Sequence, residues 1–573
     1  MISVKTRKLL AVLLCIVMVA AFFAGCSGDA KPSGNQGGNT PANNNNGEPT
    51  PITIFFQDDN VNFPQNMDRP TMQTVAAIAK EKFNLDISIE TAISSEMESA
   101  VNTRLVSGSS NMPDILCYDF AIQRVVELYQ QGLVLGLTDL IKEHAPEIKY
   151  RMMERYPAIA IACSTNDGEI LRIPNMEESI QHEVYVSHIR YDWLKELGLE
   201  VPTTPDEFFD TFKAFRDNDM NGNGRADEVF MPGSVITYSD VFCTAFDVPK
   251  LMDSIRSWAV DDNGKIYNTM ITDNAKAFAE YSAKLVEAGI LDVEFTNQTA
   301  DTINTKRFNN IVGGTTGSWW DSVILDTQLA EKVPGVEYIP MEPLISASGD
   351  QFILRRNNVG WSNHMLTAAC KDPVGCIKLL DWCWTKEGTQ ILYFGEAAPG
   401  GDYYETPKDV PEGIVDIDYQ LVYTEKGTKE MAEEPELWAK MGWNQTAFLP
   451  QYFESGVDCV ALEFYTAFGT DACGKAAEVE FNKTHLNRFI NDIGRFEVSF
   501  ATPTSEQIEE LNKYDDLWIY MDETFTNFLL GRESFDKWQD FVDQCNALGL
   551  QDAIAKVFQP RYDAYVKILE SMK

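Results

Sequence analysis

The sequence predicts an α/β protein whose folded part forms two lobes or domains. The chain has 573 residues, of which 44% are hydrophobic and 11% are aromatic. This length exceeds what one hydrophobic core usually serves, and the apolar content is sufficient for two. From residue 52 onward, strand-like and helical patterns alternate along the chain, which is typical of a sheet covered by helices.

The folded part opens with a strand, helix, strand order. Residues 52–57 are rich in strand-forming side chains, residues 71–83 have apolar side chains at helical spacing, and residues 85–90 alternate between apolar and polar. A helix that joins two strands usually leaves them parallel. We therefore expect a mostly parallel sheet in this part of the chain.

The first 25 residues have the pattern of a secretory signal. Three basic residues within positions 5–8 precede an uninterrupted apolar run at residues 9–24, which is shorter than the roughly 20 residues of a comfortable membrane span. The run leads into Phe23-Ala24-Gly25-Cys26, which resembles the lipobox of bacterial lipoproteins, although Phe23 stands where Leu is usual. This resemblance implies that residues 1–25 are removed and that Cys26 is lipidated. The alternative is an ordinary signal peptide with a chance cysteine.

Residues 26–51 predict a flexible tether. They consist almost entirely of Gly, Asn, Ser, Pro and Asp, and such a segment cannot bury enough apolar surface to offset its conformational entropy. Acyl chains on Cys26 would hold the protein on the outer face of a bacterial cell membrane. The expected location is therefore extracellular and membrane-anchored.

The net charge disfavours two classes of partner, and the cysteine content indicates the state of the thiols. The formal net charge is −39, so nucleic acid and anionic lipid surfaces would repel the chain. Beyond Cys15 in the signal and Cys26, nine cysteines are scattered without a CxxC pair. This number and spacing suggest reduced, buried thiols, and no disulfide can be assigned.

Several blocks in a fixed order carry a family resemblance. Residues 106–134 contain small residues, Pro-Asp-Ile, a strand, an aromatic residue, a helix and Gly-Leu. Residues 189–208 read Arg-x-Asp-Trp-Leu, Leu-Gly-Leu, Pro-x-Thr and Glu-Phe. Later blocks lie at residues 283–291, 372–388 and 525–551. Together they resemble the extracellular family 1 solute-binding proteins of ABC sugar importers, in their large Gram-positive lipoprotein branch.

The resemblance implies a type II periplasmic-binding-protein-like fold with a cleft between two lobes. The first lobe would comprise roughly residues 52–163 and 361–394, and the second roughly residues 170–350 and 395–573. It further implies a monomeric, non-enzymatic subunit that captures an oligosaccharide by lobe closure and delivers it to the transmembrane subunits of an ABC permease.

The sharpest chemical motif is the acidic and amide-rich loop at residues 217–228. Calcium takes about six to eight oxygen ligands, and alternate residues of a tight loop can direct carboxylates, amides and a carbonyl to one point. The alternative is a solvated turn, because Asn, Asp and Gly are common in turns.

Two ligand registers fit this loop. In the EF-hand register, Asp217, Asp219 and Asn221 are the first ligands, Gly222 makes the turn and Glu228 is the last ligand. The register of alginate-type relatives uses Asp219, Asn221, Asn223, the Arg225 carbonyl, Asp227 and Glu228. We favour the second register, because it uses the adjacent acidic pair and places a glycine after the third side-chain ligand. Bound Ca²⁺ would be structural.

The resemblance also indicates three places that contact sugar. Tyr118 and Asp119 follow the Pro-Asp-Ile strand. Trp319, Trp320 and Asp321 end a Gly-rich segment, in which two threonines replace the usual apolar pair. Trp361 begins the return to the first lobe. Aromatic faces and hydrogen-bonding side chains hold carbohydrates, whereas the alternative for each aromatic residue is core packing.

Enzyme motifs are weak in this sequence. Residues 469–476 nearly match a Walker A loop, but Ala476 stands where a hydroxyl must bind Mg²⁺. No HExxH or GxSxG pattern is present. The 86 acidic residues could supply carboxylate pairs anywhere. A surface-anchored polysaccharide hydrolase is therefore the second hypothesis, and a glycan adhesin the third.

Overall fold

The computed structural model describes the following residues of the compact unit formed by residues 46–573: 47–59, 64–107, 111–177, 185–248, 258–317, 321–353, 363–394, 403–405, 422–434, 437–441, 449, 452–453 and 499–572. Among the predicted features, Cys26, Trp319, Trp320, Trp361 and the Walker-like residues 469–476 lie outside these ranges. No helix within the described ranges is long and apolar enough to cross a membrane.

The first sheet has four strands in the order β11-β3-β1-β2. They are β1 (Thr50–Gln57), β2 (Leu85–Ala92), β3 (Ile115–Cys117) and β11 (His364–Leu366). Strand β1 is parallel to β2 and β3, while β11 is antiparallel to β3. Helix α2 (Pro70–Phe83) joins β1 to β2 and ends at Asn84 in the left-handed conformation. The predicted strand, helix, strand opening and mostly parallel sheet are confirmed.

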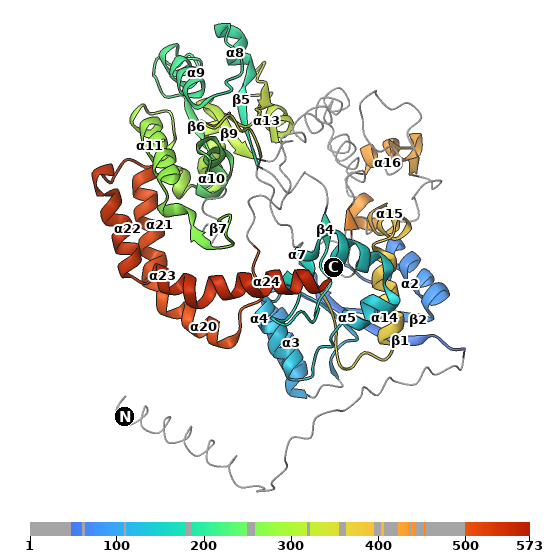
Figure 1. Ribbon diagram of the computed structural model, residues 1–573. Coiled ribbons are helices and arrows are strands. Elements are labelled where there is room, and N and C mark those ends of the chain that lie inside the picture. The colour runs from blue at the N-terminus through green and yellow to red at the C-terminus, as the bar shows by residue number, and fades with distance from the viewer. Residues whose placement is uncertain are drawn as a thin grey trace, which may run out of the picture. The chain divides into compact units, whose positions relative to one another are not determined.

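Helices cover both faces of this sheet (Figure 1). They are α2, α3 (Ser94–Ser107), α4 (Ile122–Gln130), α5 (Thr138–His144), α14 (Pro373–Cys383) and α15 (Lys386–Phe394). Successive side chains of a strand point to opposite faces. Accordingly, Ile52, Ile54 and Phe56 pack in a core with residues of α2, α5 and α14, whereas Phe55 packs with residues of α3 and α4.

The second sheet has the order β10-β5-β9-β6. Its strands are β5 (Val186–Arg190), β6 (Val229–Met231), β9 (Val312–Gly317) and β10 (Tyr338–Pro340). Strand β5 is antiparallel to β9 and β10, and β6 is parallel to β9. In β9, the hydroxyl of Thr315 donates to the Met231 carbonyl at 2.7 Å. This bond allows a polar residue to occupy a buried strand.

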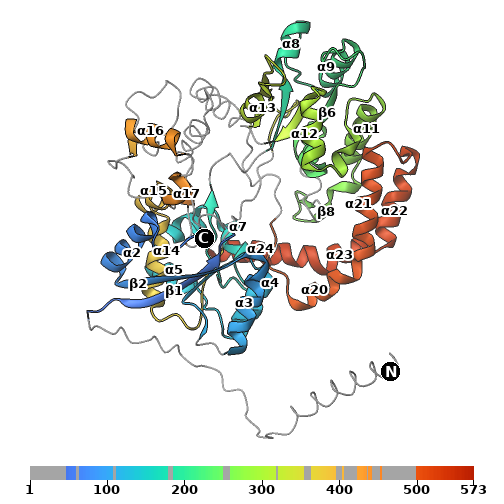
Figure 2. The same ribbon diagram turned by 180° about the vertical axis from the view of Figure 1, so that it is seen from behind.

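One hydrophobic core joins helices that are distant in sequence. It contains residues of α8 (Tyr191–Leu197), α9 (Pro205–Asp217), α10 (Val235–Phe242), α11 (Asp273–Glu287), α21 (Asp515–Leu529) and α22 (Trp538–Ala547). Helices α11, α21 and α22 lie side by side in Figure 2. The last helix, α24 (Gln559–Met572), contacts α7 (Pro157–Ala162) through Ile568 and Ile161.

The remaining elements are shorter or more peripheral. The helices are α6 (Pro146–Ile148), α12 (Ala300–Phe308), α13 (Asp321–Leu329), α16 (Glu425–Glu433), α17 (Leu437–Met441), α20 (Ser505–Leu511) and α23 (Leu550–Ala553), and the paired strands are β4 (Met176–Glu177) with β14 (Tyr452–Phe453), β7 (Trp258–Val260) with β8 (Ile266–Asn268), and β12 (Tyr404–Glu405) with β13 (Val422–Tyr423).

Asp114 of the Pro-Asp-Ile segment links three parts of the first sheet. Its side chain is 1% exposed and accepts hydrogen bonds from the backbone N–H groups of Thr53 and Lys371, each at 2.8 Å. The ammonium group of Lys371 also lies 2.8 Å from the Asp114 carboxylate. The aspartate of this segment therefore holds β1 and the chain after β11 against β3.

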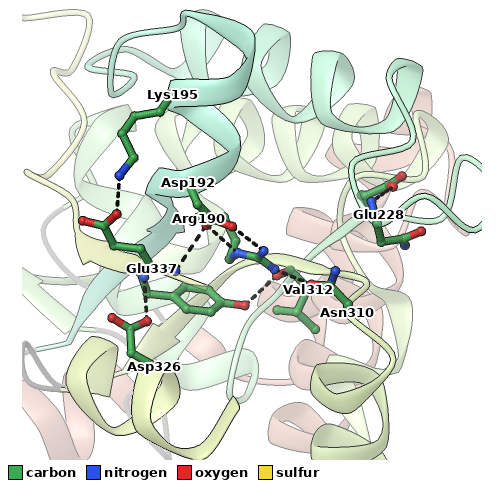
Figure 3. Close-up of polar contacts among 10 residues, drawn as sticks. Arg190, Asp192, Lys195, Glu228, Asn310, Val312, Asp326 and Glu337 are labelled. Carbon is green, nitrogen blue, oxygen red and sulfur yellow. Dashed lines mark hydrogen bonds and ion pairs between the residues drawn. The ribbon is translucent and has the colours of Figure 1, made fainter. Parts of the chain in front are cut away.

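Arg190 of the Arg-x-Asp-Trp segment forms the centre of a polar network in the second sheet (Figure 3). Its guanidinium donates to both carboxylate oxygens of Asp192, at 2.8 and 2.6 Å, and to Asn310 Oδ1 at 2.5 Å. It also lies 4.1 Å from the centroid of the Trp193 ring. Nearby, burial raises the pKa of Tyr338 to about 12, and its hydroxyl donates to a backbone carbonyl. These contacts give the segment a structural role.

Candidate functional site

The loop proposed to bind calcium connects α9 to β6. Thr204 and Glu207 form a capping box at the start of α9, and Asn218 ends the helix. Asp219 follows with φ of 48°, and two glycines further along, at positions 222 and 224, also have positive φ. Positive φ is cheap for glycine and tolerated by aspartate. The loop therefore turns back on itself within a few residues.

Side chains of the second register converge within this loop. The Asp219 carboxylate accepts hydrogen bonds from the backbone of Asn223 and Gly224 at 2.9 and 2.8 Å. The amides of Asn221 and Asn223 both donate to the Asp227 carboxylate, at 2.9 to 3.1 Å. In the same loop, the Arg225 backbone N–H donates to an asparagine side chain. Carboxylate and amide groups of these residues are thus in contact within one tight turn, and both kinds of group can supply oxygen ligands to calcium.

Glu228 ends the loop in a buried position. Its Oε1 accepts a long hydrogen bond of 3.3 Å from the Asn221 backbone, while its buried Oε2 has no hydrogen-bond partner within the described residues. Burial raises the pKa of Glu228, and the charges of Asp227 and Asp219 raise it further, against backbone hydrogen bonds that lower it. A nearby cation would stabilise this carboxylate and occupy its free oxygen.

The donor set fits calcium better than a metal that prefers nitrogen or sulfur. Across the described ranges, no three His, Cys, Asp or Glu side chains lie close enough to hold a metal by themselves. A site here would need amide and carbonyl oxygens beside the carboxylates, and calcium accepts all three kinds of ligand.

Asp217 is a calcium ligand in the EF-hand register and not in the register that begins at Asp219. The Asp217 side chain is 59% exposed and forms an ion pair with Lys213 one turn earlier on α9. It therefore belongs to the surface of the helix, and no hydrogen bond ties it to the loop residues in the described structure. This arrangement favours the register that begins at Asp219.

The predicted ligand residues of the first lobe lie just after β3. Tyr118 is half-buried, and its ring packs edge-on against Phe120 with centroids 4.6 Å apart. Asp119 is exposed, and its Oδ1 accepts two hydrogen bonds from Asn363, at 2.8 and 3.0 Å. In α/β sheets, ligands bind outside the carboxyl ends of parallel strands. Both residues occupy that position.

Two buried polar residues beside this edge were missed by the sequence analysis. Asn363 is 5% exposed, and its Oδ1 has no partner among the described residues. Arg172 is 8% exposed and donates to the Phe120 carbonyl at 2.9 Å. The sequence offered one signal for Arg172, a lone charge within the apolar stretch around Leu171, and none for Asn363.

A small depression lies at the start of β5. Its lining includes Tyr185, Asp240, Glu342 and Phe352. Aromatic and carboxylate side chains are the kinds that hold sugars in carbohydrate-binding proteins. The predicted residue Asp321 is the first residue of α13, and the three predicted tryptophans lie outside the described ranges.

Comparisons with known proteins agree with this architecture. No family model matches the chain. A fructooligosaccharide ABC transporter substrate-binding protein of Streptococcus pneumoniae, FusA, is 26% identical over 471 residues, which cover 80% of this chain and 81% of the relative. A calcium-free structure of the alginate-binding protein AlgQ2 is 20% identical, with a TM-score of 0.58, and the match covers 90% of this chain and 98% of that one.

A third comparison gives the same fold. A structure of an EF-hand mutant of FusA in complex with fructo-nystose is 19% identical, with a TM-score of 0.59, and the match covers 90% of this chain and all of the other. These likenesses show the two-lobed α/β fold over most of the chain, as the sequence predicted.

Proposed function

We propose that the chain is a solute-binding protein of an ABC oligosaccharide importer, and that it captures an oligosaccharide between its lobes and delivers it to a membrane permease. The observation that carries this proposal is the relation to FusA, which spans four-fifths of both chains. A binding subunit needs no catalytic groups. Ligand would favour the closed state only by its difference in affinity between the open and closed states.

The first-lobe edge supports a sugar-binding role. Tyr118 offers an aromatic face that is only half-buried, and the Asp119 carboxylate is exposed while Asn363 fixes its orientation. Such a pair can stack on a sugar ring and accept hydrogen bonds from its hydroxyls. We assign these two residues to the ligand site, and propose Trp319, Trp320, Asp321 and Trp361 as further contacts.

We also propose a structural Ca²⁺ in the loop between α9 and β6. The ligands would be Asp219, Asn221, Asn223, the Arg225 carbonyl, Asp227 and Glu228. When bound, the ion would offset two of the three negative charges of these carboxylates and fix the loop. The loop is tied to the second sheet directly, because the N–H of Val229 donates to the Ile311 carbonyl at 2.8 Å.

A ligand screen with matched variants tests the proposed function. The chain without its signal would be titrated with neutral and acidic oligosaccharides, including fructo-oligosaccharides, by calorimetry. We expect Tyr118→Ala to weaken the tightest interaction about 10- to 100-fold, because aromatic anchors dominate recognition sites. Tyr150→Ala is the control, since Tyr150 is 51% exposed and lies elsewhere. Equal affinity of both variants would refute the assigned site.

Membrane anchoring through Cys26 is a separate proposal. The Cys26→Ser chain is expected to move from the membrane fraction to the culture medium, because one residue carries the acyl chains. The fold should be unchanged, since Cys26 precedes the first described strand by more than twenty positions in the sequence. Fractionation followed by immunoblotting measures this. Retention of the variant in the membrane fraction would contradict it.

A further inference from the structure

Two cysteines that lie beside the first sheet are in contact. The Sγ atoms of Cys370 and Cys376 are 3.6 Å apart, and both residues are buried. Cys370 ends a turn after β11, where its N–H donates to the Thr367 carbonyl at 3.0 Å. Cys376 lies in the first turn of α14. The chain between them is short, so the two sulfurs meet across a single bend.

The backbone on both sides of this bend is fixed. The N–H of Lys371 donates to the buried Asp114 carboxylate at 2.8 Å. Asp372 caps α14 by accepting a hydrogen bond from the Gly375 N–H at 2.9 Å. A disulfide requires sulfurs about 2.05 Å apart. The remaining approach of about 1.5 Å lies within the reach of small side-chain rotations.

A neighbour on the same helix shows the contrast. Cys383 is also buried, but its thiol donates to the Leu379 carbonyl of its own helix at 3.1 Å. Its sulfur is therefore used in a local hydrogen bond. Cys370 instead directs its thiol at another sulfur.

We propose that Cys370 and Cys376 form a disulfide in the exported protein. The oxidant is an external disulfide, either a small molecule or a thiol oxidase. The thiolate of one cysteine attacks it and forms a mixed disulfide, and the second thiolate then displaces the reagent. The two cysteine thiols lose two electrons and two protons, and the reagent leaves as two thiols. Exported proteins meet such oxidants, whereas cytosolic proteins rarely keep disulfides.

The surroundings indicate when the bond forms. The hydrogen bond with Cys370 raises the pKa of Cys376, and burial and the charges of Asp114 and Asp372 act in the same direction. Because only the thiolate exchanges, the folded dithiol reacts slowly. The bond therefore closes while the chain folds, and it then resists external thiols until the protein is denatured.

Peptide mapping of the exported full-length protein tests this inference. The protein is denatured with an alkylating agent and without reductant, and is then cleaved with trypsin. Cleavage after Lys371 separates the two cysteines, so the bond would join the peptides 357–371 and 372–378, each of which has a single cysteine. We expect the joined species, and we expect reductant to split it.

The matched variants have opposite expected outcomes. Cys383→Ser should keep the joined peptides, and Cys376→Ser should leave Cys370 alkylated. Two separately alkylated peptides from the unmodified protein would overturn the proposal, as would a bond from either cysteine to another one. The result depends on export alone, so a failure of oligosaccharide binding would leave it standing, and its own failure would leave the binding proposal intact.

Discussion

Replacing Asp114 by alanine is expected to lower the free energy of unfolding by about 4 kcal/mol. The substitution removes the acceptor for two backbone N–H groups, those of Thr53 and Lys371. An unpaired buried donor costs roughly 1–3 kcal/mol, and loss of the contact with the Lys371 ammonium adds a smaller amount, because that lysine is half exposed.

Denaturant unfolding of three variants measures this effect. Asp114→Asn keeps an oxygen acceptor, so about half of the loss is expected. Asp86→Ala removes an exposed carboxylate on β2 and should change stability by no more than about 0.5 kcal/mol. If Asp114→Ala were as stable as Asp86→Ala, the proposed anchoring role of this aspartate would be wrong.

Calcium is expected to stabilise the protein by about 2.7 kcal/mol when the free ion exceeds its Kd 100-fold. The double variant Asp219→Asn, Asp227→Asn should lose this increment, because two of the anionic ligands become neutral. Asparagine keeps one acceptor oxygen at each position, and the loss of the other affects melting with and without calcium alike. The comparison therefore separates the stabilisation by calcium from the stability of the loop itself.

Melting temperatures with EDTA and with added calcium measure this increment. Asp217→Ala separates the two registers, since Asp217 pairs with Lys213 outside the loop. This variant should keep the calcium response in the register that begins at Asp219 and lose it in the EF-hand register. A wild-type protein that melts identically with calcium and with EDTA would show that the loop is only a turn.

Local sequence patterns were enough to predict the opening of the fold. The apolar period changes from strand to helix and back between residues 52 and 90, and β1, α2 and β2 follow these changes closely. The antiparallel strand β11 was harder to predict, because it has only three residues and its partner strand is distant in the sequence. His364 of β11 pairs with Cys117 of β3, which is 247 positions earlier. The lobe boundaries remain a prediction.

The same distinction applies to the candidate sites. The loop proposed to bind calcium spans twelve consecutive residues, so its donor types and spacing are visible in the sequence. The partner of Asp119 is 244 positions away in the chain, and the partner of Asp114 is 257 positions away. Such contacts depend on tertiary packing, which local patterns in a single sequence do not show.

The central claim is that the chain binds an oligosaccharide and releases it unchanged. The most direct measurement is a calorimetric titration with the tightest oligosaccharide from the screen, followed by mass analysis of the recovered sugar. We expect one sugar per protein molecule, recovered at its original length after prolonged incubation. Recovery of shortened chains would mean a polysaccharide hydrolase, and absence of binding across neutral and acidic oligosaccharides would contradict the account.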